Sequence, residues 1–214
     1  MKKALICVDV QYDFMPVSDE EYKNGMGGAL AVKEADQIIP VINELLPKYD
    51  LVIFTKDWHL KNNIYFADSH PGKKPFDQME IHGKIETLWP VHCVQNTRGA
   101  DLHDDIDLNL IEGEYYIFKK GVHKYTHPYG GFGDSHEDTG LHDFLIEHEV
   151  KELDIVGLAL DYCVKDTAVF GAKLGYKVNV ISEGTKAIAD DFTDTIVEFA
   201  NEGVILTTIS TLRD

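Results

Sequence analysis

Hydrophobic positions along the chain fall into short apolar runs separated by longer amphipathic stretches. The runs are rich in β-branched residues, and their apolar positions are nearly continuous, which is typical of strands buried on both faces of a parallel sheet. Six runs predict strands, at residues 3–8, 51–55, 115–118, 155–158, 178–181 and 204–208. Four amphipathic stretches predict helices, at residues 36–48, 138–149, 162–174 and 190–201.

The order of these elements predicts the fold class. Strands that alternate with helices over short connections form βαβ units, so we expect an α/β fold of three layers, α/β/α, around a mostly parallel sheet of about six strands. Pro40 leaves the start of the first helix open, because proline is tolerated only near the first turn. No repeat or linker divides residues 1–214, which we therefore predict to be a single domain.

Two long segments with little periodicity, 57–109 and 121–134, interrupt the alternation of strands and helices. A compact domain rarely keeps loops of this length unless they carry function. In an open α/β sheet, ligands bind beyond the carboxyl ends of the strands. Both segments begin at such ends, so we expect the functional site there.

The charge of the chain narrows the classes of partner. Lys and Arg number 20 against 37 Asp and Glu, which gives a net charge of −17. Such a field repels nucleic-acid phosphates and anionic lipid, and no basic patch offsets it, so we expect no nucleic-acid or membrane partner. The apolar runs are much shorter than the roughly 20 residues that span a bilayer, and no signal-peptide cleavage site follows the first run. We therefore expect a cytoplasmic protein.

The three cysteines differ in their surroundings. Cys163 stands where the fourth predicted strand gives way to a helix, and backbone N–H groups with the helix dipole lower the pKa of a thiol at such a position. This placement favours a nucleophile. Cys7 lies inside an apolar strand, and we expect it, like Cys93, to serve in packing. An odd number of cysteines in a chain of this length makes a disulfide framework unexpected.

Two further strand ends carry candidates for acid–base chemistry. Asp9 follows an apolar strand, so partial desolvation should raise its pKa toward the useful range of a general base. Lys120 ends the third predicted strand. Taken singly, Asp9 could be a capping or salt-bridging residue and Lys120 an exposed turn residue. Together with Cys163 they supply the thiol, proton acceptor and cation that cysteine-mediated acyl transfer requires.

A third group of residues is suited to metal binding. Asp57 and His59 point to the same side of an extended segment, because alternate residues of a strand do so, and His92 is a third candidate. One carboxylate and two imidazoles suit Zn, Fe or Mn, with water completing the shell. An Asp-x-His motif alone favours a metal-free role, but its place at a strand end reverses this preference. The competing histidines of the segment are His70, His82 and His103.

Five sequence motifs together resemble those of the isochorismatase-like cysteine hydrolases, and more narrowly those of the nicotinamidases. The motifs are VDVQYDF at 8–14, KDWH at 56–59, WPVHCV at 89–94, KG at 120–121 and GLALDYCV at 157–164, and the resemblance covers residues 3 to about 181. It implies the isochorismatase-like hydrolase fold and hydrolysis of nicotinamide to nicotinate and ammonia through a cysteine thioester, in NAD salvage. The alternatives are a related hydrolase acting on another small amide or carbamoyl compound, and a non-catalytic binding protein of the same fold.

The resemblance also implies roles for individual residues. Cys163 matches the nucleophile, Asp9 its base and Lys120 the third member of the triad. Asp57, His59 and His92 match the ligands of one divalent metal ion, for which Zn is expected first and Fe or Mn are possible. Backbone N–H groups of Ala159 and Cys163 match the oxyanion hole, beside a cis peptide bond between Leu158 and Ala159. The residues expected to line a nicotinamide pocket are Phe14, Trp89, Tyr162 and either Tyr129 or Phe132.

The sequence departs from the family pattern in two places. Asn63 stands where relatives often carry a further histidine, so we expect three protein ligands and water around the metal. The segment 121–134 lacks the usual Asp-Ser-Tyr-Ser-Ala-Phe type of sequence. The family pattern therefore does not determine which of its residues line the pocket. The family also suggests a homo-oligomer.

Overall fold

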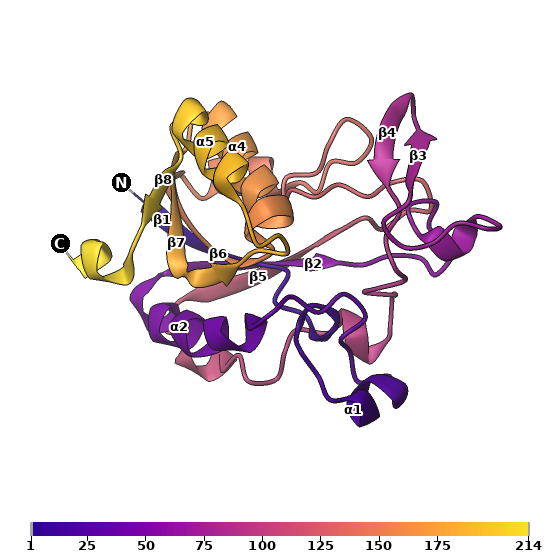
Figure 1. Cartoon of the computed structure of the whole chain (residues 1–214). Helices are drawn as coiled ribbons and strands as arrows, with labels where there is room; N and C mark the ends of the chain where they lie inside the picture. Colours follow the sequence, from indigo (N-terminus) through magenta and orange to yellow (C-terminus); the bar gives the residue numbers. More distant parts are fainter. Residues whose placement is uncertain (1, 214) are drawn as a thin grey trace.

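The computed structural model describes residues 2–213, and over this range six strands form one parallel sheet in the order β5-β2-β1-β6-β7-β8. The strands are β1 (Lys2–Val8), β2 (Leu51–Asp57), β5 (Glu114–Lys120), β6 (Val150–Leu158), β7 (Lys177–Lys186) and β8 (Ile205–Thr207). The helices are α1 (Asp19–Lys23), α2 (Ile38–Leu45), α3 (Leu141–Glu147), α4 (Lys165–Lys173) and α5 (Thr193–Glu202). Figure 1 shows α4 and α5 on one side of the sheet and α2 on the other. The predicted α/β/α fold with a parallel sheet is confirmed.

The regular elements differ from prediction mainly at their ends. The first predicted helix is split into a 3₁₀ turn at Ala35–Gln37, helix α2 and a second 3₁₀ turn at Leu46–Lys48. Pro40 is the third residue of α2, where a missing N–H costs no helical hydrogen bond. The helix expected from Tyr162 begins instead with a π turn at Leu160–Val164, followed by α4.

A small hairpin inside the long segment 57–109 was not predicted. Strands β3 (Gln78–Ile81) and β4 (Lys84–Thr87) pair antiparallel, apart from the main sheet. His82 and Gly83 connect them with φ of 52° and 77°, which is the left-handed pair that a tight two-residue hairpin requires. Each strand has only four residues, so its alternation was too short to stand out.

Two hydrophobic clusters cover the two faces of the sheet. Residues Leu5, Cys7 and Phe54 belong to the cluster that contains α2. Ala4, Ile6, Val8 and Ile53 belong to the cluster that contains residues of α3, α4 and α5. Successive residues of a strand point to opposite faces, so strands covered on both faces need apolar residues at every position. This explains the continuous apolar runs of β1 and β2, and it confirms Cys7 as a buried core residue. The prediction of burial on both faces is wrong for the edge strands β5 and β8, whose residues are mostly exposed. No helix within residues 2–213 is long and apolar enough to span a membrane.

Gly157 allows β1 and β6 to approach closely near their carboxyl ends. Its φ is 114°, and a Cβ placed on it would lie 2.1 Å from the carbonyl oxygen of Val8. We expect Gly157→Ala to lower the free energy of unfolding by about 3 kcal/mol, because strain and a backbone clash add. Urea denaturation measures this loss.

Gly175→Ala is the matched control for this prediction. Gly175 also has a positive φ, of 92°, but no atom lies within 4 Å of a Cβ placed there. The free energy of unfolding of Gly175→Ala should therefore fall only by the cost of a positive φ in alanine, about 1 kcal/mol. Equal losses in the two variants would show that the close approach to Val8 contributes nothing.

Candidate active site

Four neighbouring strands bring the predicted catalytic residues to one edge of the sheet. Asp57 and Lys120 are the last residues of β2 and β5 and stand opposite each other in the pairing of these strands. Asp9 follows β1, and Cys163 lies in the π turn after β6. Since the sheet is parallel, all four strand ends point the same way, and residues far apart in sequence become neighbours.

Lys120 connects the two carboxylates to the thiol. Its Nζ lies 2.6 Å from Oδ1 of Asp57 and 2.9 Å from Oδ2 of Asp9. The same nitrogen lies 3.6 Å from Sγ of Cys163. Burial disfavours the ammonium, but Asp57 and Asp9 outweigh this effect and hold the pKa of Lys120 well above its usual value. Lys120 is therefore a buried charged group and not an exposed turn residue.

Asp9 has the properties expected of a proton acceptor. It is fully buried, and Oγ1 of Thr55 donates a hydrogen bond of 2.6 Å to its Oδ1. Burial raises the pKa of the Asp9 carboxyl, although Lys120 opposes this rise. The direction agrees with the prediction from sequence.

The pKa of Cys163 corrects one expectation. The thiol was expected to have a lowered pKa at the start of a helix, but burial raises its pKa well above the usual value, and Lys120 opposes this only in part. The turn that holds Cys163 is also a π turn, with α4 beginning only at Lys165. A raised pKa disfavours the thiolate, so a base is needed to remove the proton before Cys163 attacks. Oxygen atoms of Asp9 and Asp57 and Sγ of Cys163 all lie within 4.8 Å of one another, so Asp9 is within reach.

The backbone before Cys163 has the form that the family resemblance implied. The Leu158–Ala159 peptide bond is cis, and Ala159 is buried. The N–H groups of Ala159 and Cys163 remain the predicted oxyanion hole.

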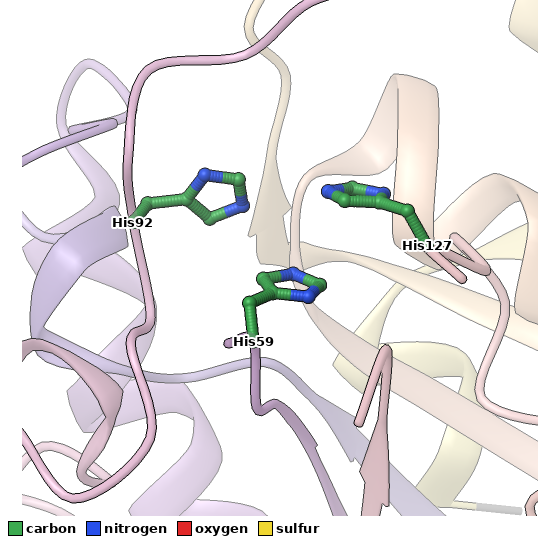
Figure 2. A group of neighbouring side chains, drawn as sticks. All are labelled: His59, His92 and His127. Carbon is green, nitrogen blue, oxygen red and sulfur yellow. The ribbon is translucent and has the colours of Figure 1, made fainter. Parts of the chain in front are cut away.

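Three buried imidazoles meet next to this group. His59 follows β2, while His92 and His127 come from the loops after β4 and β5, and Figure 2 shows the three rings grouped around a common space. One ring nitrogen from each lies within 4.8 Å of the others. A group of this kind could hold a divalent metal ion.

The hydrogen bonds behind His59 and His92 fit such a role. Nδ1 of His59 lies 3.0 Å from the carbonyl oxygen of Gly121, and Nδ1 of His92 lies 2.8 Å from that of Pro90. A carbonyl only accepts, so each Nδ1 carries the proton and each Nε2 keeps a free lone pair. These Nε2 atoms lie 3.4 Å and 3.7 Å from the carboxylate oxygens of Asp57. The three residues proposed from sequence as metal ligands are therefore neighbours in space.

His127 was missed in the sequence. It is buried, its ring is stacked on that of His59 with centroids 4.4 Å apart, and burial lowers its pKa well below the usual value. The three protein ligands expected from the sequence were Asp57, His59 and His92, and His127 was not among them. Its position in the loop after Lys120 could have indicated it, because this loop begins at the carboxyl end of a strand. From the sequence, the loop was expected only to supply aromatic residues that line the pocket.

The competing histidines lie outside this cluster. His70 and His82 each place Nε2 next to a backbone carbonyl oxygen, of Ile64 at 2.7 Å and of Tyr125 at 2.9 Å. His103 is stacked on Tyr12 with ring centroids 4.4 Å apart.

A narrow aromatic cavity opens beside Cys163. Its lining includes Asp57, His92, His127 and the four predicted aromatic residues Phe14, Trp89, Tyr129 and Tyr162. Trp89 donates a hydrogen bond of 3.0 Å from Nε1 to the hydroxyl of Tyr129, and its ring meets that of Tyr162 edge to face, at 87°. Phe132, the alternative to Tyr129, packs in the core against Tyr176. The cavity has the aromatic walls that suit a small flat ring.

Comparison with known proteins agrees with this geometry. The isochorismatase domain family matches residues 3–211. The chain belongs to the isochorismatase family. Among curated members, it is 43% identical over 187 residues to a nicotinamidase of Acinetobacter baylyi, covering 86% of this chain and 81% of that protein. It is 37% identical over 218 residues to a nicotinamidase of Escherichia coli, covering 99% of this chain and 96% of that protein.

Solved structures of the family superpose over nearly the whole chain. A nicotinamidase and pyrazinamidase of Acinetobacter baumanii has a TM-score of 0.88 at 36% identity, covering 99% of this chain and 98% of that one. A pyrazinamidase of Pyrococcus horikoshii, solved in complex with zinc, has a TM-score of 0.73 at 32% identity, covering 98% and 100%.

Proposed function

We propose that this isochorismatase-family protein is a nicotinamidase, which hydrolyses nicotinamide to nicotinate and ammonia through a thioester on Cys163. The observation that carries the proposal is the thiol of Cys163 at the wall of an aromatic cavity, within 4.8 Å of a carboxylate oxygen of Asp9. Lys120 stands beside both groups. The names of the curated relatives support the same activity.

In the first half of the reaction, Asp9 takes the proton of the Cys163 thiol, and the thiolate attacks the carboxamide carbon. The charge of Lys120 stabilises the thiolate while it forms. The N–H groups of Ala159 and Cys163 donate to the oxyanion that develops. When the carbon–nitrogen bond breaks, Asp9 returns the proton to the leaving nitrogen, and ammonia departs.

In the second half, Asp9 acts as a base again. It removes a proton from a water molecule, whose oxygen attacks the thioester carbon. The carbon–sulfur bond breaks, and the proton on Asp9 returns to Cys163. The carboxylic acid product loses its own proton to solvent and is released as nicotinate. Dividing the reaction in this way replaces one high barrier with two lower ones.

We further propose that Asp57, His59 and His92 hold one divalent metal ion near the cavity. The fit rests on free, buried Nε2 atoms next to a carboxylate, and Nε2 of His59 has no hydrogen-bond partner within residues 2–213. Imidazole and carboxylate ligands suit Zn first, with Fe or Mn as alternatives. Such an ion, when bound, would supply a Lewis acid for the pyridine nitrogen of the substrate. Phe14, Trp89, Tyr129 and Tyr162 would hold the faces and edges of the ring.

Removal of the metal gives a separate prediction. Treatment with a chelator is expected to reduce nicotinamide turnover about 100-fold, because the pyridine nitrogen then loses its positioned partner. Zn should restore turnover, whereas Mg, which prefers oxygen ligands, should not. Unchanged turnover in protein shown by mass spectrometry to be metal-free would contradict a role for the ion.

Ammonia release from a panel of amides tests the proposed function. We expect turnover of nicotinamide and of pyrazinamide, and little of benzamide, which has the same shape but no ring nitrogen. Preference for a ureide or another carbamoyl compound would identify a different hydrolase of the family. Absence of turnover on every amide would favour a binding protein.

A further inference from the structure

Neither ring nitrogen of His127 has a hydrogen-bond partner among the described residues, although its side chain is buried. Leaving a buried polar atom without a partner costs about 1–3 kcal/mol. The neighbouring His59 and His92 each have one ring nitrogen at a backbone carbonyl oxygen. His127 also lines the cavity beside Cys163. A group that binds in this cavity is therefore needed to satisfy its nitrogens.

The loop that carries His127 is held from two sides. Nδ2 of Asn63 donates to the carbonyl oxygens of Thr126, at 2.9 Å, and His123, at 3.2 Å. The buried carboxylate of Glu137 accepts from the N–H of Gly121 at 2.7 Å and from the hydroxyl of Thr126. These bonds fix the backbone immediately before His127. The imidazole is delivered to the cavity by ordered structure and not by a free loop.

The electrostatics of Asp57 leave a role for a further ligand. Its Oδ1 already lies 2.6 Å from the ammonium of Lys120. This ammonium partly neutralises the negative charge with which Asp57 would bind a metal. A charge-assisted hydrogen bond of this kind already occupies one of the two carboxylate oxygens. A neutral imidazole adds a donor atom and brings no second negative charge next to Asp9.

We propose that His127 is a fourth protein ligand of the divalent metal ion, beside Asp57, His59 and His92. The inference rests on the metal site of the proposed function. The rings of His127 and His59 are stacked and inclined by only 9°. The lone pair of a ring nitrogen lies in the ring plane, so two stacked rings cannot both direct a lone pair at the same ion. The ring of His127 would therefore rotate to face an ion held by His59. This rotation breaks no hydrogen bond, because its nitrogens make none within residues 2–213.

A set of three imidazoles and one shared carboxylate has a consequence for metal choice. Imidazole-rich sites favour Zn, Co and Ni over Mn and Mg, which prefer oxygen ligands. His127 should therefore strengthen the binding of Zn more than that of Mn. Its loss should narrow the difference in affinity between the two metals.

Metal affinity, measured by competition with a chromophoric chelator, tests the inference without reference to hydrolysis. We expect His127→Ala to weaken Zn binding about 10- to 100-fold, the range seen when a supporting group of a metal site is lost, and to weaken Mn binding less. His127→Phe keeps the ring stacked on His59 but removes both nitrogens, and it should behave in the same way even if the alanine variant is unstable. His123→Ala, in the same loop and outside the cavity lining, should bind both metals as the parent protein does.

The visible spectrum of the Co-substituted protein provides a second readout. Loss of a ligand nitrogen changes the coordination of Co, so His127→Phe should change the spectrum while His123→Ala leaves it intact. Parent-like Zn affinity and an unchanged spectrum in His127→Phe would overturn the inference. So would a raised KM for nicotinamide with unchanged metal affinity, since His127 would then contact the substrate, and so would a parent protein that binds no Zn. His127-dependent Zn binding in a protein without amidase activity would refute the proposed function alone.

Discussion

Replacing Cys163 with alanine is expected to lower the release of ammonia from nicotinamide by about 10⁴-fold or more. Without sulfur no thioester forms, and the remaining groups can only hold the amide near water. The thiol is buried and contacts Lys120, which keeps its pairs with Asp9 and Asp57 in the variant. The fold should therefore persist. Steady-state kinetics, with circular dichroism as a check on folding, measures the effect.

Cys7→Ala is the matched control for this prediction. Cys7 is also a free, fully buried cysteine, but it lies in the core beneath α2 and burial raises the pKa of its thiol with no ammonium beside it. Its loss should cost some stability and leave the kcat for nicotinamide within about twofold, since only packing is affected. Near-parent turnover in Cys163→Ala would show that Cys163 is not the nucleophile.

Asp9→Asn is expected to reduce turnover by about 10³-fold or more, because the amide has nearly the shape of the carboxylate but cannot accept the proton of Cys163. The raised pKa of the thiol makes this step necessary, since little thiolate is present without a base. Lys120 keeps its ion pair with Asp57, so the site should remain assembled. Single-turnover kinetics should place the loss in the formation of the thioester.

Asp154→Asn separates loss of the base from loss of a buried negative charge. Asp154 is also fully buried, and it lies five residues before Ala159 on the chain. Its carboxylate pairs with Lys3 at 3.1 Å and accepts a hydrogen bond from Asn179 at 2.6 Å. This variant should lose about 1–3 kcal/mol of stability and keep its catalytic rate. A comparable fall in turnover in both variants would mean that the effect of Asp9→Asn is structural.

The sheet could be predicted because its strands obey a local rule. Strands covered on both faces are apolar at most positions, so β1, β2 and residues 155–158 of β6 appear as continuous runs of sequence. Helix ends were less certain, since α2 is flanked by 3₁₀ turns whose formation depends on packing against the sheet. The hairpin of β3 and β4 was missed because four-residue strands contain too few positions for a period to be seen.

The candidate site followed from the same rule. Asp9, Asp57 and Lys120 each stand at the carboxyl end of a predicted strand, and a parallel sheet gathers these ends at one edge. His127 could not be placed in this way. It lies seven positions beyond the end of β5, in a loop whose path depends on bonds to Asn63 and Glu137 from other segments.

For this protein, the order of apolar runs and the residues at their ends determined the α/β architecture, the family and the group of thiol, carboxylate and ammonium. Only the tertiary structure decided the direction in which the pKa of Cys163 shifts and the number of imidazoles in the candidate metal cluster. Burial, which no local pattern measures, turned the expected lowering of the Cys163 pKa into a rise. Contacts between distant segments brought the third imidazole into the cavity. Local sequence specifies secondary structure, whereas desolvation and long-range contacts arise only when the chain is folded.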